Sequence, residues 1–401
     1  MKKTHFIAGS VLASLIVGMI YIYAMFFMIH PAGVSGSDLL TYVGYMNEWY
    51  ETGSLPDMCQ TYPMFYFVLR FIFHFFRNWT VTMLFFGGTW AILSNIVQIA
   101  FVKSYLDEKV YLYSILAGSA LSFAWPVSFR YSFFGGETFW EILLEQVFLT
   151  SGATAPDHSL SFLFVKPFAL VCIRLFWHLL EIDEHDWRNA VKCAACFAVA
   201  LFLSVIAKPN FYQCFAPAGV IAVLAYLVHS GWSVFKRCVL TAIAYLPATV
   251  WVLYSMRMKL NPFVVDPLRG INTFRDGVPI PIVLIRAIIF CVFVTVCMLV
   301  LKRRNRLLIL GWLTYLFGTL EYLMLFEPDD PLTLSMGWGY YIGMYVLFAT
   351  AAIAQRETLV CPVDNRQTAY ILGCTLLGLH TCAGIAVFII RWTPFWVAYL
   401  Q

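Results

Sequence analysis

Charge is scarce in this 401-residue sequence. Only 12% of the residues are Asp, Glu, Lys or Arg, whereas an ordinary soluble domain carries about a quarter. Hydrophobic residues make up 61% and aromatic residues 18% of the chain. Such a chain cannot cover a folded core with a charged surface, so the composition excludes an ordinary soluble protein and is typical of a polytopic membrane protein.

Cysteines in loops are also scarce. Most of the 11 cysteines lie inside apolar runs, where cysteine usually acts as a small hydrophobe. Only Cys59 falls in a predicted outer loop, which excludes a disulfide framework. The sequence shows no convincing internal repeat. The net charge of +4 gives no indication of nucleic acid as a partner.

Apolar windows of the length that crosses a bilayer core, about 20 residues, recur almost from end to end. We therefore predict an all-α integral membrane protein with about 11 transmembrane helices in one domain, 1–401. The first span covers about 6–29. The expected later spans are 80–105, 110–129, 159–182, 189–207, 212–229, 238–256, 281–301, 307–326, 339–355 and 367–390.

Basic residues predict the orientation, because cytoplasmic loops carry an excess of Lys and Arg. Lys2 and Lys3 precede the first span, and the cluster Lys302-Arg303-Arg304-Asn305-Arg306 follows another. We therefore expect a cytoplasmic amino terminus. The long connections then face outward, where function concentrates in loops held by a rigid scaffold. These outer segments are 30–79, 130–158, 257–280 and 327–338.

The first outer segment contains a short apolar stretch, Pro63 to Phe76, which Arg70 and His74 interrupt. Its length and its polar interruptions predict a helix that lies near the outer membrane surface.

Asp38, preceded by Ser35, Gly36 and Ser37, is the first acid beyond the opening span. A carboxylate near water at the membrane surface can act as a general base. Alternatively, Asp38 caps a helix from Leu39 to Trp49. Both interpretations stay open on spacing alone.

The second outer segment contains Glu137, Glu141 and Glu145, whose four-residue spacing places three carboxylates on one helix face. They either bind a cation or are simply hydrated. Asp157 and His158 directly precede the next span. The pair either handles protons or caps that helix.

Cations at the outer ends of spans are candidates for anion binding. Lys208-Pro209 interrupts two spans, and the lysine either meets an anion such as a lipid phosphate or extends to the surface. The third outer segment carries Arg269 and Arg275 on a side that should be poor in cations. Phosphate suits such an arginine patch.

Near the end of the chain, Glu321 lies inside a span and is a functional candidate by default, although pairing with a cation is an equal alternative. Trp338 and Tyr340 lie among glycines, which allow a sugar ring to approach closely. An interfacial aromatic belt is the other interpretation of these rings.

Several of these motifs together resemble a known family. The segment Asp38-Leu39-x-x-Tyr42 and the later Tyr62-Pro63 are similar to motifs of the GT-C superfamily of polyprenyl-phosphate-sugar-dependent glycosyltransferases. With Lys208-Pro209 and Gly337-Trp338-Gly339-Tyr340, they also resemble bacterial membrane proteins of capsule and surface-polysaccharide clusters. The chain departs from the family pattern at Met64, where many relatives carry a second proline.

The resemblance implies a GT-C-like fold in the bacterial inner membrane and transfer of a sugar at the extracytoplasmic face. The donor is a polyprenyl-phosphate sugar, and the acceptor is a hydroxyl of a glycan, lipid or protein. Asp38 is the expected catalytic base, and Lys208, Arg269 and Arg275 are expected to bind the donor phosphate. The candidates for substrate binding are Tyr42, Glu137, Asp157, His158, Glu321, Trp338 and Tyr340. No cofactor is required, although a divalent cation remains an option.

Two other functions stay open. An oligosaccharide polymerase or ligase would rely on the arginines of the third outer segment. A transporter of lipid-linked saccharides would need a cationic patch and often has repeated halves.

Overall fold

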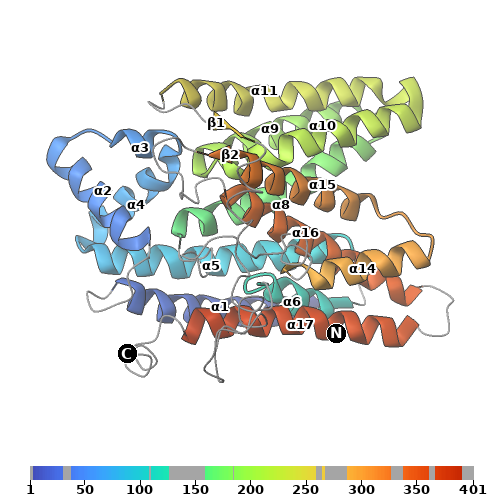
Figure 1. The fold of residues 1–401 in the computed structure, drawn as a ribbon, viewed down its shortest axis with the longest axis horizontal. Helices are drawn as coiled ribbons and strands as arrows, with labels where there is room; N and C mark the ends of the chain where they lie inside the picture. Colours follow the sequence, from blue (N-terminus) through green and yellow to red (C-terminus); the bar gives the residue numbers. More distant parts are fainter. Residues whose placement is uncertain are drawn as a thin grey trace.

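Long α-helices make up most of the chain in the computed structural model (Figure 1). The structure describes residues 3–29, 38–107, 110–125, 159–183, 185–258, 264–266, 287–326, 337–360 and 366–390. The longest helices are α1 (Lys3–Ile29), α5 (Trp79–Ser104), α8 (Leu160–Glu181), α9 (Trp187–Ala207), α10 (Asn210–Ser230), α11 (Phe235–Met258), α15 (Arg306–Met324), α16 (Gly337–Glu357) and α17 (Arg366–Ile390). The shorter helices are α2 (Asp38–Thr52), α3 (Asp57–Gln60), α4 (Pro63–Phe76), α6 (Tyr111–Ala120) and α14 (Ile289–Val300).

Eight segments of the described chain are long and apolar enough to cross a membrane. One of them, Asn210–Arg257, contains both α10 and α11, which the short 3-10 helix Gly231–Val234 separates. The predicted helical membrane class is therefore confirmed. In the expected spans 110–129 and 281–301, the described residues hold only the shorter helices α6 and α14. The count of about 11 spans stays a prediction.

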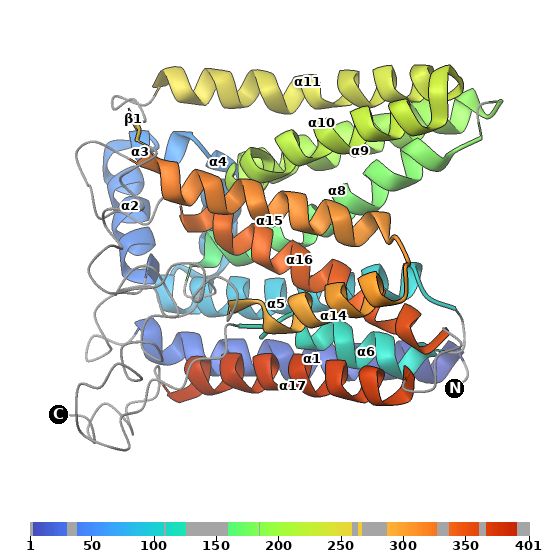
Figure 2. The same cartoon turned by 45° about the vertical axis from the view of Figure 1, so that its right-hand side comes forward.

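The long helices run in broadly the same direction, and α2 crosses that direction at one end of them (Figures 1 and 2). It begins at Asp38, so this acid is the first residue of the expected helix. Its buried residues are Leu39, Tyr42, Met46 and Trp49. Their spacing of three and four residues forms one face, which holds the helix against the bundle.

The helix predicted from Pro63 to Phe76 is present as α4 with those bounds. Pro63 occupies its first turn, where the missing N–H of proline is not needed. Arg77 ends the helix in a left-handed conformation (φ 51°) and donates its N–H to Phe73. Asn78 then caps α5 by accepting a hydrogen bond from the Val81 N–H (3.0 Å). The tight turn therefore orders α4 against α5.

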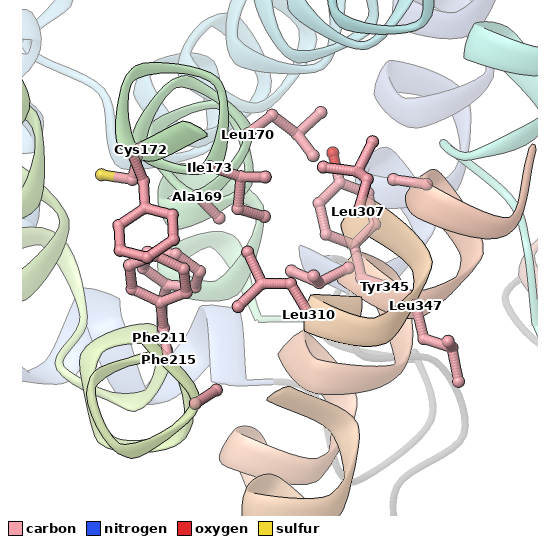
Figure 3. Packing of buried hydrophobic residues seen from close by; sticks show 14 of the residues in the cluster. Ala169, Leu170, Cys172, Ile173, Phe211, Phe215, Leu307, Leu310, Tyr345 and Leu347 are labelled. Carbon is pink, nitrogen blue, oxygen red and sulfur yellow. The ribbon is translucent and has the colours of Figure 1, made fainter. Parts of the chain in front are cut away.

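Helix α8 connects two hydrophobic clusters and is buried along most of its length. Leu160, Leu163 and Phe164 belong to the cluster of α1, α2, α4 and α5. Figure 3 shows the other side of α8, where Ala169 and Ile173 lie between phenylalanines of α10 and Leu310 of α15. Helix α8 is therefore held between the two clusters.

Helices α15 and α16 approach closely through glycines. A side-chain carbon on Gly318 would collide with the Gly339 carbonyl group, whose carbon would be 2.7 Å away. A carbon on Gly343 would lie 2.9 Å from the Thr314 carbonyl oxygen. Small residues that let backbones approach are a common way to pack helices inside membranes.

One small antiparallel pairing was not predicted from the sequence. Strand β1 (Val264–Val265) pairs with β2 (Leu325–Phe326), and the Asp266 N–H also donates to Met324 (2.9 Å). This pairing holds the start of the segment 264–266 beside the end of α15.

Gly318→Ala should lower the stability of the protein by about 1–3 kcal/mol, because the added methyl group meets backbone that cannot move independently. The thermal midpoint in detergent measures this effect. Gly378→Ala in α17 is the matched control, because a side-chain carbon there meets nothing within 4 Å. An equal loss in both variants would contradict the close-packing argument.

Candidate functional site

The candidate site forms where helix ends meet. Asp38 and Tyr42 lie one turn apart on α2, so their side chains share a face. Ser159 precedes α8 and Ser161 lies in its first turn. Lys208 stands between α9 and α10, in an extended conformation that breaks the helical path before Pro209. The predicted interruption at Lys208-Pro209 is confirmed.

A hydrogen-bonded cluster joins these side chains. The Tyr42 hydroxyl donates to Asp38 Oδ2 (3.3 Å) and also bonds Ser159 Oγ (2.7 Å) and Ser161 Oγ (2.9 Å). The two serine hydroxyls bond each other at 3.0 Å. Lys208 Nζ donates to Ser161 (2.8 Å) and, at 3.5 Å, to Ser159. We call these five residues the Asp38–Lys208 cluster.

The Lys208 side chain points into the protein, and only 5% of its surface is exposed. Its ammonium group lies 3.9 Å from the centre of the Trp338 ring and 5.9 Å from that of Tyr62. Aromatic faces stabilise a desolvated cation. The snorkelling alternative for this lysine is therefore wrong, and the partly buried Trp338 ring contacts its ammonium group.

Burial lowers the pKa of Lys208 to about 7, because the charged form loses its hydration, and the nearby Asp38 carboxylate opposes this shift. Burial raises the pKa of Tyr42 well above its usual value, and the charge of Asp38 adds to the effect. The tyrosine hydroxyl therefore keeps its proton at neutral pH. The Lys208 amino group can gain or lose a proton near neutral pH.

Glu321 and Tyr340 lie apart from these hydrogen bonds. The Glu321 carboxylate is buried against the backbone of Gly339, and neither oxygen has a hydrogen-bond partner in the described part of the chain. The ring of Tyr340 stacks on Tyr322 and contacts Tyr315. The alternative pairing of Glu321 with a cation is therefore not observed within the described ranges, and the buried Tyr340 ring is not part of an outer belt.

The remaining predicted site residues lie outside the described residues. They are Arg269 and Arg275, the proposed phosphate ligands, and Glu137, Asp157 and His158, the proposed substrate contacts.

Sequence reasoning missed Ser159, Ser161 and Tyr62 as members of this site. Both serines are fully buried. Serine is common near helix starts for capping alone, so its presence there does not indicate a functional site. The position of the two serines directly after Asp157-His158 was the only available signal. The sequence presents Tyr62 only as part of the motif Tyr62-Pro63.

In the part of the chain that the structure describes, no group of three or more His, Cys, Asp or Glu side chains is placed to hold a metal ion. Comparison of the chain with protein-family models, curated proteins and solved structures found no match.

The lowered pKa of Lys208 makes the stability of the protein depend on pH. Below about pH 7 the folded state must hold a buried charge, and this cost is relieved as pH rises towards the usual lysine pKa of 10.5. Lys208→Met should therefore raise the thermal midpoint at about pH 6, and its advantage over the native protein should shrink by about pH 9. A difference that stays constant across this range would contradict the assignment.

Proposed function

We propose that this protein is a glycosyltransferase that moves a sugar from a polyprenyl-phosphate donor to a hydroxyl acceptor. The observation that carries the proposal is the meeting of Asp38 and Lys208 in one buried cluster. A carboxylate and an ammonium group on opposite sides of a transfer reaction can serve the attacking and the leaving oxygen. These two residues are 170 positions apart in the chain, so their meeting is a property of the fold.

Asp38 is half-buried at the first turn of α2 and acts in this proposal as the general base. It takes the proton of the acceptor hydroxyl while that oxygen attacks the anomeric carbon of the sugar. The bond from this carbon to the phosphate oxygen breaks on the opposite side, so the configuration inverts. General bases of this kind contribute about 100- to 10,000-fold to the rate.

Lys208 stabilises the leaving lipid phosphate in this proposal. Its position between α9 and α10 places the ammonium group next to the hydroxyls of Ser159 and Ser161. An ammonium group inside a low-dielectric site stabilises developing negative charge more strongly than in water. Arg269 and Arg275 remain proposed contributors to the same phosphate site.

A bilayer location suits such a donor, because the polyprenyl tail needs an apolar environment. The eight apolar segments and the exposed hydrophobic side chains of α1, α10 and α11 provide that setting. We propose that the site faces the extracytoplasmic side of a bacterial inner membrane, with the amino terminus in the cytoplasm.

Asp38→Asn should lower kcat by about 100-fold or more, because the amide cannot accept the acceptor's proton. The assay measures sugar transfer from polyprenyl-phosphate sugars by the purified protein. Glu48→Gln on the exposed side of the same helix is the control and should retain turnover. Full activity of Asp38→Asn would rule out the base assignment.

Lys208→Ala should weaken binding of farnesyl phosphate, a short analogue of the leaving group, by about tenfold or more, because a charge-assisted hydrogen bond is lost. Calorimetry in detergent measures this affinity. Lys192→Ala changes an exposed lysine near the opposite end of α9 and should leave binding unchanged. Equal affinities in the native protein and Lys208→Ala would remove Lys208 from the phosphate site.

A further inference from the structure

A continuous line of hydrogen bonds connects Asp38 with Lys208. It runs from Asp38 Oδ2 to the Tyr42 hydroxyl (3.3 Å), to Ser161 Oγ (2.9 Å) and to Lys208 Nζ (2.8 Å). Ser159 supplies a parallel branch, at 2.7 Å from the Tyr42 hydroxyl and 3.5 Å from Lys208. Each step is within hydrogen-bonding distance, so no added molecule is needed to complete the line.

The chemistry of the groups gives the line a direction. An ammonium group only donates, a carboxylate only accepts, and a hydroxyl does both. With Lys208 charged and Asp38 ionised, Ser161 accepts from the lysine, Tyr42 accepts from the serine, and Asp38 accepts from the tyrosine. If each donor passes its proton to its acceptor, every hydrogen bond changes direction. The net result is the transfer of one proton from Lys208 to Asp38, and the opposite shifts return it.

The middle of the line is shielded from solvent. Both serines are fully buried, and Tyr42 and Lys208 expose only 4% and 5% of their surfaces. Solvent water therefore does not compete for these hydroxyls. The ring of Tyr42 is held edge-on by Phe65 and Tyr66, which keeps its hydroxyl in the line.

We propose that Tyr42 and Ser161 form a proton relay between Asp38 and Lys208. Tyr42 then belongs to the interior of the site as a positioning and relay residue, and its hydroxyl is not a contact for substrate.

In the proposed transfer reaction, the relay carries the proton released by the acceptor to the leaving phosphate. This role of the relay rests on the proposed function. The acceptor hydroxyl gives its proton to Asp38 as its oxygen bonds to the sugar. Lys208 gives a proton to the departing phosphate and is recharged from Asp38 through Tyr42 and Ser161. The donor phosphate diester and the protonated monoester product both carry one negative charge, so the site returns to its starting state.

The coupling can be tested without any substrate. Protein labelled with [ε-13C]lysine is titrated by NMR in detergent, and the Lys208 signal is assigned by its loss in Lys208→Arg. Four proteins form a double-mutant cycle: the native chain, Asp38→Asn, Tyr42→Phe and the combined variant. Within the described ranges, the titratable groups around Lys208 are Asp38, Tyr62 and, through the two serines, Tyr42.

Asp38→Asn should lower the proton affinity of Lys208 by about tenfold in the native background, because a neighbouring negative charge is lost. In the Tyr42→Phe background the same change should have less than about a third of that effect on the titration midpoint, since the connecting hydroxyl is gone. Tyr45→Phe, on the same helix but outside the line, should preserve the full effect.

An equal midpoint shift in both backgrounds would mean that charge acts through space alone, and it would overturn the relay. A Lys208 midpoint that does not respond to Asp38→Asn would overturn it as well. Ser161→Ala provides a second interruption if Tyr42→Phe fails to fold. Intact coupling in a protein that transfers no sugar would reject the proposed function and leave the relay standing.

Discussion

A buried ammonium group loses its hydration and must be stabilised by nearby dipoles and charges. In this fold, several helix ends meet around Lys208 and supply them. The hydroxyl of Ser161 comes from the start of α8, the ring of Trp338 from α16 and the carboxylate of Asp38 from α2. The starts of these three helices must therefore lie close together in space. The burial of α8 between two hydrophobic clusters holds this helix in place.

The close contact of α15 and α16 serves the same centre. Gly318 and Gly339 let these two backbones touch, and Trp338 is the neighbour of Gly339 at the start of α16. A wider helix spacing would displace that start and with it the ring beside the lysine. The packing of α15 against α16 therefore determines the position of the Trp338 ring beside Lys208, through the start of α16.

The sequence predicted what local patterns can encode. Apolar windows indicated the helical membrane class, Pro209 indicated the break beside Lys208, and Pro63 indicated the start of α4. The roles of Ser159 and Ser161 could not be predicted, because their partners Tyr42 and Lys208 are distant in sequence. Hydrogen bonds between distant segments leave no periodicity in the chain, and serine is common at helix starts.

The placement of hydroxyls between Asp38 and Lys208 has a physical consequence for a site of this kind. A direct ion pair in a buried environment satisfies both charges with each other and leaves little capacity for a substrate. Here Tyr42 and Ser161 separate the two charged groups while keeping them coupled by hydrogen bonds. The Coulomb attraction between the charges falls with distance. The two charged groups are thus held apart and yet coupled through two hydroxyls, and the proposed transfer uses both of them.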